Sequence, residues 1–305
     1  MKIPWTDPSL YTTKSEEMAK IAATHYDSVQ QRDLDITSPN ERENQITYHL
    51  TNLTKAPEAM TAHMSTNLKY DEIETALKQS PNEKAPGLNG IPTELYKKLN
   101  ERWKSKKEDD QHVNIIKILQ KVYNDIETNG VTNHEFTAGW VCPLYKKKDR
   151  REVENYRPVT VLNAEYKIMM TVIMNRSSPL APSLINRCQA AFIKGRSIHD
   201  QIDLVNHMID LCEIIGQDGA IIALDQEKAY DRICHDYLWR TLEAMGIPQL
   251  TIDMIKALYA NPGTCVILNG IMSKNFYVNQ GVRQGDPLSC LLFNMAIEPL
   301  LVIMH

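Results

Sequence analysis

The first third of the chain repeats apolar residues every three to four positions, which is the spacing of one helix face. Two capping patterns, a hydroxyl residue followed three positions later by glutamate, predict helix starts at Thr13 and at Ser38. A third helix is predicted from Asp71 to just before Pro81. The apolar face of the first helix consists of Met18, Ile21, Ala22, His25 and Val29. A histidine on such a face is interpreted as a packed residue and not as a ligand.

Beyond residue 200 the pattern predicts the order helix, strand, helix, helix, hairpin, helix. The apolar face of the first of these helices is Leu204, Met208, Leu211, Cys212 and Ile215. The apolar run 220–224 predicts a short buried strand that ends on Asp225. Asn269-Gly270 predicts a two-residue hairpin turn, and the apolar run 288–304 predicts the last helix. Mixed helices and antiparallel strands indicate an α+β fold.

Amino-acid composition excludes only a few classes of protein. The chain has 305 residues, 43% of them hydrophobic, which is enough for a sizeable core. Its net charge of -4 argues mildly against a dedicated nucleic-acid binder, but positive charge gathers at residues 146–151. The six cysteines have no Cys-x-x-Cys spacing, so neither a zinc site nor a disulfide framework is expected. With no signal-like or membrane-spanning apolar segment, an intracellular protein without membrane contact is expected.

Two segments carry candidate chemistry. A carboxylate at the end of a buried strand, as predicted for Asp225, is suited to hold a hard cation such as Mg²⁺ against phosphates. A helix cap or a solvated turn is the alternative for this residue. Residues 281–289 combine two glycines with Asp286 as a cap and Pro287 in a first helical turn. A capped helix alone would leave the intervening Arg283-Gln284-Gly285 without an explanation.

These segments resemble motifs of one family. Asp225 to Asp231 reads Asp-x-x-Lys-Ala-aromatic-Asp and resembles motif A of reverse transcriptases from non-LTR (LINE-like) retrotransposons. Gly281 to Ser289 resembles motif B of the same enzymes, and residues 141–149 with 155–159 resemble their fingers hairpin. Residues 84–92 and 189–201 resemble two further fingers blocks. Asn89 and Ala191 depart from the family pattern, which has Asp and Gly there, and this puts the local turns in doubt more than catalysis.

The resemblance implies an α+β fold of reverse-transcriptase fingers and a partial palm, as in a right-hand polymerase. This domain would span residues 71–305, with its core motifs at 140–305. Residues 1–70 would form an N-terminal helical extension or linker. The family's motif C, an aromatic-x-Asp-Asp hairpin, does not occur before residue 305, so the chain is expected to be incomplete and inactive by itself.

The same resemblance implies site residues. Asp225 would be the catalytic metal ligand, helped by the Gln226 carbonyl. Tyr230 would lie under the sugar and exclude a 2′-hydroxyl, the alternative being a packed core aromatic. The other implied nucleotide-binding residues are Lys147, aligned to within one residue, Arg157, Gln284 and Gly285. The implied nucleic-acid contacts are Lys146, Lys148, Arg196 and Arg283.

The implied function is RNA-directed DNA polymerisation, in which a primer 3′-hydroxyl attacks a dNTP. The implied cofactor is Mg²⁺, as two ions, with Mn²⁺ as a substitute. The implied partners are an RNA template, a DNA primer or target, and dNTPs, in the cytoplasm and nucleus. Two alternatives stay open: a catalytically dead remnant that binds RNA or nothing, and a group II intron maturase-like protein. Template and target specificity and oligomeric state are not readable from the sequence.

Overall fold

The computed structural model describes all residues except 5, 7–9, 32–37, 106–111, 261 and 305. Its helices are α1 (Ser15–Val29), α2 (Pro39–Leu50), α3 (Glu58–Thr61), α4 (Tyr70–Gln79), α5 (Thr93–Lys104), α6 (Ile115–Asn129), α7 (Ala164–Ser177), α8 (Ala181–Leu184), α9 (Ile198–Ile215), α10 (His235–Ala244), α11 (Gln249–Leu258) and α12 (Ser289–Ile303). Its strands are β1 (Gly139–Tyr145), β2 (Tyr156–Leu162), β3 (Gly263–Leu268), β4 (Ile271–Met272) and β5 (Phe276–Tyr277). This mixture of helices and one sheet confirms the α+β class.

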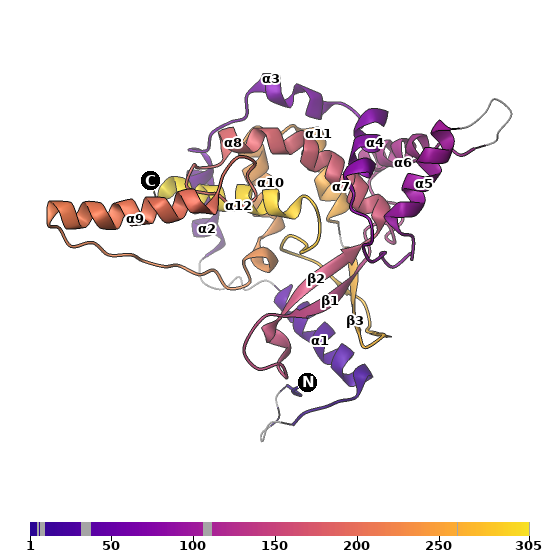
Figure 1. The fold of residues 1–305 in the computed structure, drawn as a ribbon, viewed down its shortest axis with the longest axis horizontal. Coiled ribbons are helices and arrows are strands. Elements are labelled where there is room, and N and C mark those ends of the chain that lie inside the picture. Colours follow the sequence, from indigo (N-terminus) through magenta and orange to yellow (C-terminus); the bar gives the residue numbers. More distant parts are fainter. Residues whose placement is uncertain (5, 7–9, 32–37, 106–111, 261, 305) are drawn as a thin grey trace.

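The sheet lies at one end of a helical body (Figure 1). Its strand order is β2-β1-β3-β4, with β5 also paired to β3. Strands β1 and β2 are antiparallel, with Gly139 opposite Leu162, whereas β1 and β3 are parallel. The predicted hairpin is confirmed between β3 and β4, where Asn269 and Gly270 have φ values of 51° and 80°. Positive φ at both central residues is the requirement of a type I′ turn.

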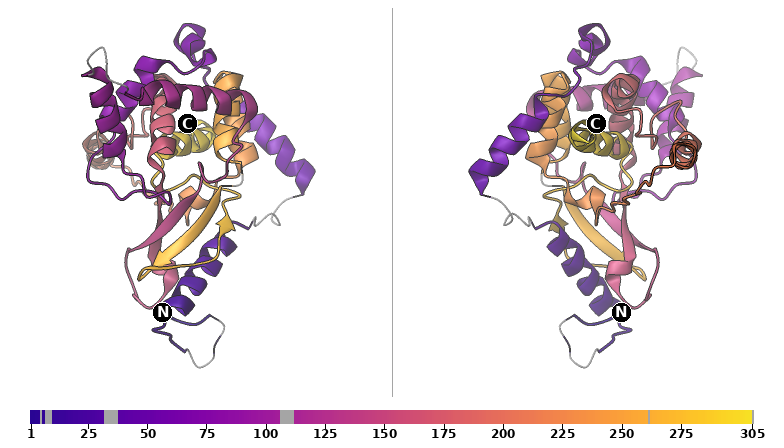
Figure 2. Two further views of the ribbon diagram at one scale, coloured as in Figure 1. Left: turned by 90° about the vertical axis from the view of Figure 1, so that its right-hand side faces the viewer. Right: turned by 90° about the vertical axis from the view of Figure 1, so that its left-hand side faces the viewer.

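Helix α1 lies alongside the strands (Figure 2). Its residues Ala22 and Tyr26 are buried in one cluster with Val141, Val266 and Phe276 of the sheet. Helix α2 in turn places Leu50 in the main core and contacts α10 and α12. Helices α1 and α2 therefore share their packing with the rest of the molecule. Leu68 and Ile73, on either side of the predicted boundary at residues 70 and 71, lie in one core, and the division into two domains stays a prediction.

The main core is formed mostly by helices α4, α6, α7, α10, α11 and α12. Helix α7 runs through its centre, and most of its residues are buried, including Tyr166, Met169 and Ile173. Helix α4 begins at Tyr70, next to the predicted Asp71, and ends before Pro81 as expected. The two helices predicted after residue 235 from their apolar faces are confirmed as α10 and α11. Gly246, with a φ of 76°, follows the end of α10.

The predicted starts of the first two helices differ in outcome. Ser38 caps α2, and its hydroxyl accepts a hydrogen bond from the Glu41 backbone N–H, as expected. The start predicted at Thr13 is wrong, because α1 begins at Ser15 after Lys14, which makes no side-chain cap. The Thr12 hydroxyl instead accepts from the Lys14 N–H and donates to Glu17.

The segment 198–226, here called the arm, projects from the body (Figure 1). Helix α9 forms as predicted, but none of its residues is buried, so its expected inward face is wrong. The strand predicted at 220–224 is also wrong: residues 217–226 form no strand, and Ile222 is 80% exposed. Within the part of the chain that the structure describes, no strand lies beside this run. Its backbone N–H and C=O groups therefore have no ladder to join.

None of the helices in the described ranges is long and apolar enough to cross a membrane.

Candidate functional site

A cavity of about 620 Å³ lies where α1, the β1–β2 hairpin, the turn at 226–231 and the loop at 278–285 meet. This volume is within the usual range of small-molecule sites. The sequence-predicted site residues that line it are Lys146, Arg157, Gln226, Tyr230, Arg283, Gln284 and Gly285. Asp225, Lys147, Lys148 and Arg196 are not among its lining residues. The fold thus brings together most of the residues that the three central motifs supply.

The β1–β2 hairpin presents the cationic side chains. Its register places Arg157 opposite Leu144, close to the turn that carries the lysines. The Lys146 N–H donates to the Asn155 carbonyl, and the Tyr145 hydroxyl donates to the carbonyl of Lys148, whose φ is 70°. Of the three consecutive lysines, Lys146 faces the cavity, whereas Lys147 and Lys148 are exposed outside it. The lysine that lines the cavity is therefore Lys146, the neighbour of the aligned Lys147.

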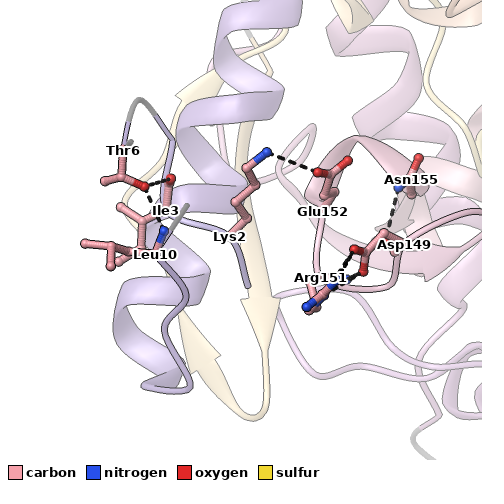
Figure 3. A network of polar contacts seen from close by, with 8 residues as sticks. All are labelled: Lys2, Ile3, Thr6, Leu10, Asp149, Arg151, Glu152 and Asn155. Carbon is pink, nitrogen blue, oxygen red and sulfur yellow. Dashed lines mark hydrogen bonds and ion pairs between the residues drawn. The ribbon is translucent and has the colours of Figure 1, made fainter. Parts of the chain in front are cut away.

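The N-terminal residues hold the far side of this turn (Figure 3). The Lys2 backbone N–H donates to the Arg151 carbonyl at 2.7 Å, and the Lys2 ammonium pairs with Glu152 at 3.2 Å. Arg151 in turn forms a two-pronged ion pair with Asp149, and its guanidinium lies 4.8 Å from the Tyr11 ring centroid. These charged groups therefore pair with one another at the surface of the hairpin turn.

The turn after residue 226 is docked on the loop of the second motif. Lys228 has φ 49°, and residues Ala229–Arg232 form a 3₁₀ helix. The Val282 N–H donates to the Tyr230 carbonyl at 2.7 Å, and the Gly281 N–H donates to the Ile233 carbonyl at 2.7 Å. A Cβ on Gly281, whose φ is 81°, would stand 2.6 Å from the Tyr230 carbonyl oxygen. Glycine is therefore required where the two motifs touch.

Tyr230 is a packed aromatic, as one of its two interpretations expects, and its role under a sugar stays a prediction. Its ring stacks on Phe293 of α12 with centroids 4.7 Å apart and planes 9° from parallel. The residue is half-buried against the main core, and it also lines the cavity. Tyr230 is thus a packed aromatic that forms part of the cavity wall.

Gln284 and Gly285 lie between the second motif and strand β2. The Thr160 N–H donates to the Gln284 carbonyl at 2.6 Å, and the Gln284 side-chain amide lies 3.5 Å from both carboxylate oxygens of Asp231. Gly285 has φ 116°, and a Cβ there would collide with the Thr160 carbonyl oxygen. No other residue type fits this approach without backbone movement.

Arg283, predicted to contact nucleic acid, is only 3% exposed. Its guanidinium donates to the Thr137 carbonyl at 2.6 Å and lies 5.7 Å from the Tyr166 ring centroid. The predicted cap Asp286 is buried beside it and accepts from the Leu288 N–H at 2.9 Å and from the Tyr166 hydroxyl at 2.7 Å. Burial raises the pKa of Asp286 to about 6. Arg283 therefore ties the motif loop to the body from within the cavity wall.

Arg196, the other arginine predicted to contact nucleic acid, is engaged by the protein itself. Its guanidinium donates to the carbonyls of Asn186, Gln189, Pro182 and Ile185. These bonds close the loop that follows α8, so the structure gives Arg196 a structural role.

Asp225 is exposed on the arm, one residue before the cavity-lining Gln226. Among the described residues no group of three or more His, Cys, Asp or Glu side chains could hold a metal ion. A two-ion site needs several carboxylate oxygens that converge on both ions. The residues described here do not fit such a site.

Sequence reasoning missed several residues of the cavity. Lys228 and Asp231 belong to the recognised motif but received no site role, whereas His25 lies in α1 and Gln30 directly follows it, in a segment that carries no motif. Burial, and then the charge of Lys228, lower the pKa of His25 to about 4. Burial raises the pKa of Asp231 to about 6, against the effects of Gln284 and Lys228. The position of Lys228 and Asp231 inside the first motif was a sequence signal from which their place in the cavity wall could have been predicted.

The charged residues in the wall favour an anion. Four cationic side chains, Lys146, Arg157, Lys228 and Arg283, line the cavity together with two carboxylates, Glu154 and Asp231. Because each fixed cation lowers the free energy of a nearby anion, a polyanionic ligand such as a triphosphate suits this balance.

Comparison with known proteins agrees with these motifs. The model of the family described as "Reverse transcriptase (RNA-dependent DNA polymerase)" matches residues 145–305. The chain is 30% identical over 242 residues to the transposon TX1 uncharacterized 149 kDa protein of Xenopus laevis, covering 79% of this chain and 18% of that protein. It is 26% identical over 186 residues to the retrovirus-related Pol polyprotein from type-2 retrotransposable element R2DM of Drosophila melanogaster, covering 60% of this chain and 17% of that protein.

A third relative is the RNA-directed DNA polymerase from mobile element jockey of Drosophila funebris, 26% identical over 162 residues, which are 52% of this chain and 18% of that protein. The chain spans less than a fifth of the length of these three relatives. Members of the matched family generally use divalent metal ions. Since the family match covers more than half of the chain, the chain belongs to the reverse transcriptase family, in its non-LTR retrotransposon branch.

Proposed function

We propose that this chain carries the nucleotide-binding part of an RNA-directed DNA polymerase, and that the cavity takes the incoming dNTP. The observation that carries the proposal is the convergence of three motifs on one cavity. Lys146 and Arg157 come from the hairpin, Tyr230 from the turn after residue 226, and Gln284 and Gly285 from the following motif loop. In this arrangement the sheet with α1 corresponds to the fingers, and the turn, loop and α12 correspond to part of the palm.

Each side chain has a distinct task in this proposal. Arg157 presents a planar fork to phosphate oxygens, and Lys146 and Lys228 add mobile point charges. The Tyr230 ring supports the sugar and leaves no room for a 2′-hydroxyl, because its stacking on Phe293 keeps it from turning aside. Gly285 allows the motif loop to approach strand β2 closely, which keeps Gln284 at the cavity wall. An RNA template and a DNA primer would lie beside the exposed Lys147 and Lys148.

The proposed cofactor is Mg²⁺, as two ions, which in such enzymes would stabilise the charge of the transferring phosphoryl group. The described carboxylates do not gather around such a pair. A noncatalytic remnant that keeps nucleic-acid binding is a second candidate. It is favoured by one observation, the exposed and isolated position of Asp225.

Calorimetric titration of purified residues 1–305 with dATP in the presence of Mg²⁺ tests the proposal. The change Lys146→Ala removes a charge from the cavity wall, and binding should weaken by about tenfold, as expected for a lost contact to a charged group. Lys147→Ala removes the same charge outside the cavity and serves as the matched control, with less than a twofold effect. Arg157→Ala should behave like Lys146→Ala.

Specificity provides the second half of this experiment. ATP, which carries a 2′-hydroxyl, should bind more weakly than dATP if Tyr230 lies under the sugar. Equal losses in Lys146→Ala and Lys147→Ala would show a diffuse charge effect and contradict a built triphosphate site. Complete absence of dATP binding would favour the remnant.

A further inference from the structure

The end of the sheet around Gly139 and Thr264, here called the inner end, holds the Arg283 guanidinium on one face. Gly139 of β1 and Thr264 of β3 are partners in the parallel register, so the Thr264 side chain lies on the face to which a Gly139 side chain would point. A Cβ at Gly139 would stand 2.6 Å from Arg283 Nη2. The missing side chain of Gly139 therefore leaves the space that the guanidinium occupies, beside Thr264.

Both Arg283 and Thr264 have buried donors that the protein does not use. The two residues are 3% and 2% exposed, and both line the cavity. Arg283 Nη1 donates to the Thr137 carbonyl, but no group in the described part of the chain bonds to Nε or Nη2 of Arg283 or to Thr264 Oγ1. Burial without a partner is costly for a polar group and more so for a charged one. These donors therefore require a ligand.

The arrangement of the donors favours a tetrahedral oxyanion. Nε and Nη2 form one edge of the planar guanidinium, and their parallel N–H groups match two oxygens of a carboxylate or a phosphate. The Thr264 hydroxyl on the same face can bond to a third oxygen, which a phosphate has and a carboxylate lacks. The carboxylate of Asp286 accepts from Leu288 and Tyr166 and leaves this edge of Arg283 unpaired.

We propose that the inner end of the cavity binds inorganic phosphate, held by Nε and Nη2 of Arg283 and by the Thr264 hydroxyl. A small free ion fits better than a nucleic-acid backbone, because the donors are almost fully buried. Helix α1 adds to this enclosure, since its Tyr26 is buried in one cluster with Val141 and Val266, which follow Gly139 and Thr264 on the same face.

This site is separate from the proposed triphosphate contacts. Arg157 lies opposite Leu144, which is five residues along β1 from Gly139. At roughly 3.3 Å per residue, the two positions are about 16 Å apart along the hairpin, and Lys146 lies farther out still. A single phosphate group does not span this distance. The inference therefore goes beyond the proposed function and does not depend on it.

Calorimetric titration of residues 1–305 with inorganic phosphate at pH 7.5 tests the site, with sodium chloride at matched ionic strength as the reference. Thr264→Val removes the hydroxyl at nearly constant volume, and phosphate binding should weaken about tenfold, as expected for a lost hydrogen bond to a charged group. Arg283→Lys keeps the charge but loses the paired N–H edge, and the loss should be larger. The matched control is Thr241→Val, which removes a buried hydroxyl of α10 outside the cavity and should leave phosphate binding unchanged.

A comparison with Lys146→Ala separates the two anion sites. This variant should weaken dATP binding and leave phosphate binding within about twofold, because Lys146 lies at the other end of the hairpin. Equal losses of phosphate affinity in Lys146→Ala and Thr264→Val would place the ion at the triphosphate contacts and overturn the inference. A chain that binds dATP but not phosphate would also overturn it and uphold the proposed function. A chain that binds phosphate but not dATP would do the reverse.

Nuclear magnetic resonance of the unaltered chain gives a readout that needs no stable variant. The Nε–H signal of Arg283, assigned through its bonded atoms, should move saturably as phosphate is added and stay fixed as chloride is added. A signal that does not move over the whole phosphate titration would refute the site, whatever the variants show.

Discussion

Helices α7 and α9 are both rich in apolar residues, yet one is at the centre of the core and the other is exposed along its whole length. The α9 helix persists because its hydrogen bonds are internal and both ends are closed, by Ser197 with Asp200 and by Gly216. The adjoining run 220–224 has no such local bonds and remains without a ladder. A helix can thus form from local interactions, whereas a strand depends on a neighbour.

The largest expected difference between the two regions is in packing energy. Met169 in α7 is fully buried and Met208 in α9 is 55% exposed, so the same truncation probes both environments. Met169→Ala should lower the free energy of unfolding by about 2–5 kcal/mol, because it leaves a cavity. Met208→Ala should change it by less than about 0.5 kcal/mol. Urea unfolding followed by circular dichroism measures both, and a similar loss for Met208→Ala would place α9 in the folded core.

Replacing a glycine by alanine should destabilise the protein more at the cavity wall than on the arm. Gly285→Ala should cost about 2–4 kcal/mol, because the new Cβ would collide with Thr160 at a φ of 116°. Gly216→Ala meets no atom within 4 Å at φ 65°, so it should cost only about 1 kcal/mol for the left-handed conformation. Thermal unfolding separates the two. Equal costs would mean that the close approach of Gly285 to β2 is absent in solution.

Asp231 lies where the arm re-enters the body, and its stability contribution should depend on pH. Its pKa is raised from 3.8 to about 6 by burial, so between these values the folded state binds more protons than the unfolded state. Stability should therefore fall as the pH rises from about 4 to about 6 and then level off. Asp231→Asn lacks this slope, and relative to the wild type it should gain on the order of 3 kcal/mol over that interval.

Urea unfolding of both proteins between pH 4 and 8 measures this difference. The buried Asp286, whose pKa is also raised to about 6, contributes a slope of the same sign to both proteins and cancels in the comparison. Parallel profiles for the two proteins would show that Asp231 is solvated.

The sequence signals succeeded where structure is decided locally. Ser38 caps its helix and Asn269-Gly270 turns its hairpin because each acts on residues two or three positions away. The prediction of a strand before Asp225 was wrong, because the apolar run 220–224 does not show whether a neighbouring strand is present to pair with it. Part of the cavity could be predicted from the sequence, because the motifs contain Arg157, Tyr230 and Gln284. Which of the three consecutive lysines faces the cavity could not be predicted, because this depends on the register of the hairpin.

The docking of α1 on β3 has a consequence for the order of folding. Residues 15–29 are synthesised more than 200 residues before strand 263–268, the surface that buries Ala22 and Tyr26. At about 5–20 residues per second the helix would wait on the order of ten seconds or longer on a ribosome before its strand is made. Interruption of synthesis within that interval would leave an apolar helix face in water, a substrate for chaperones.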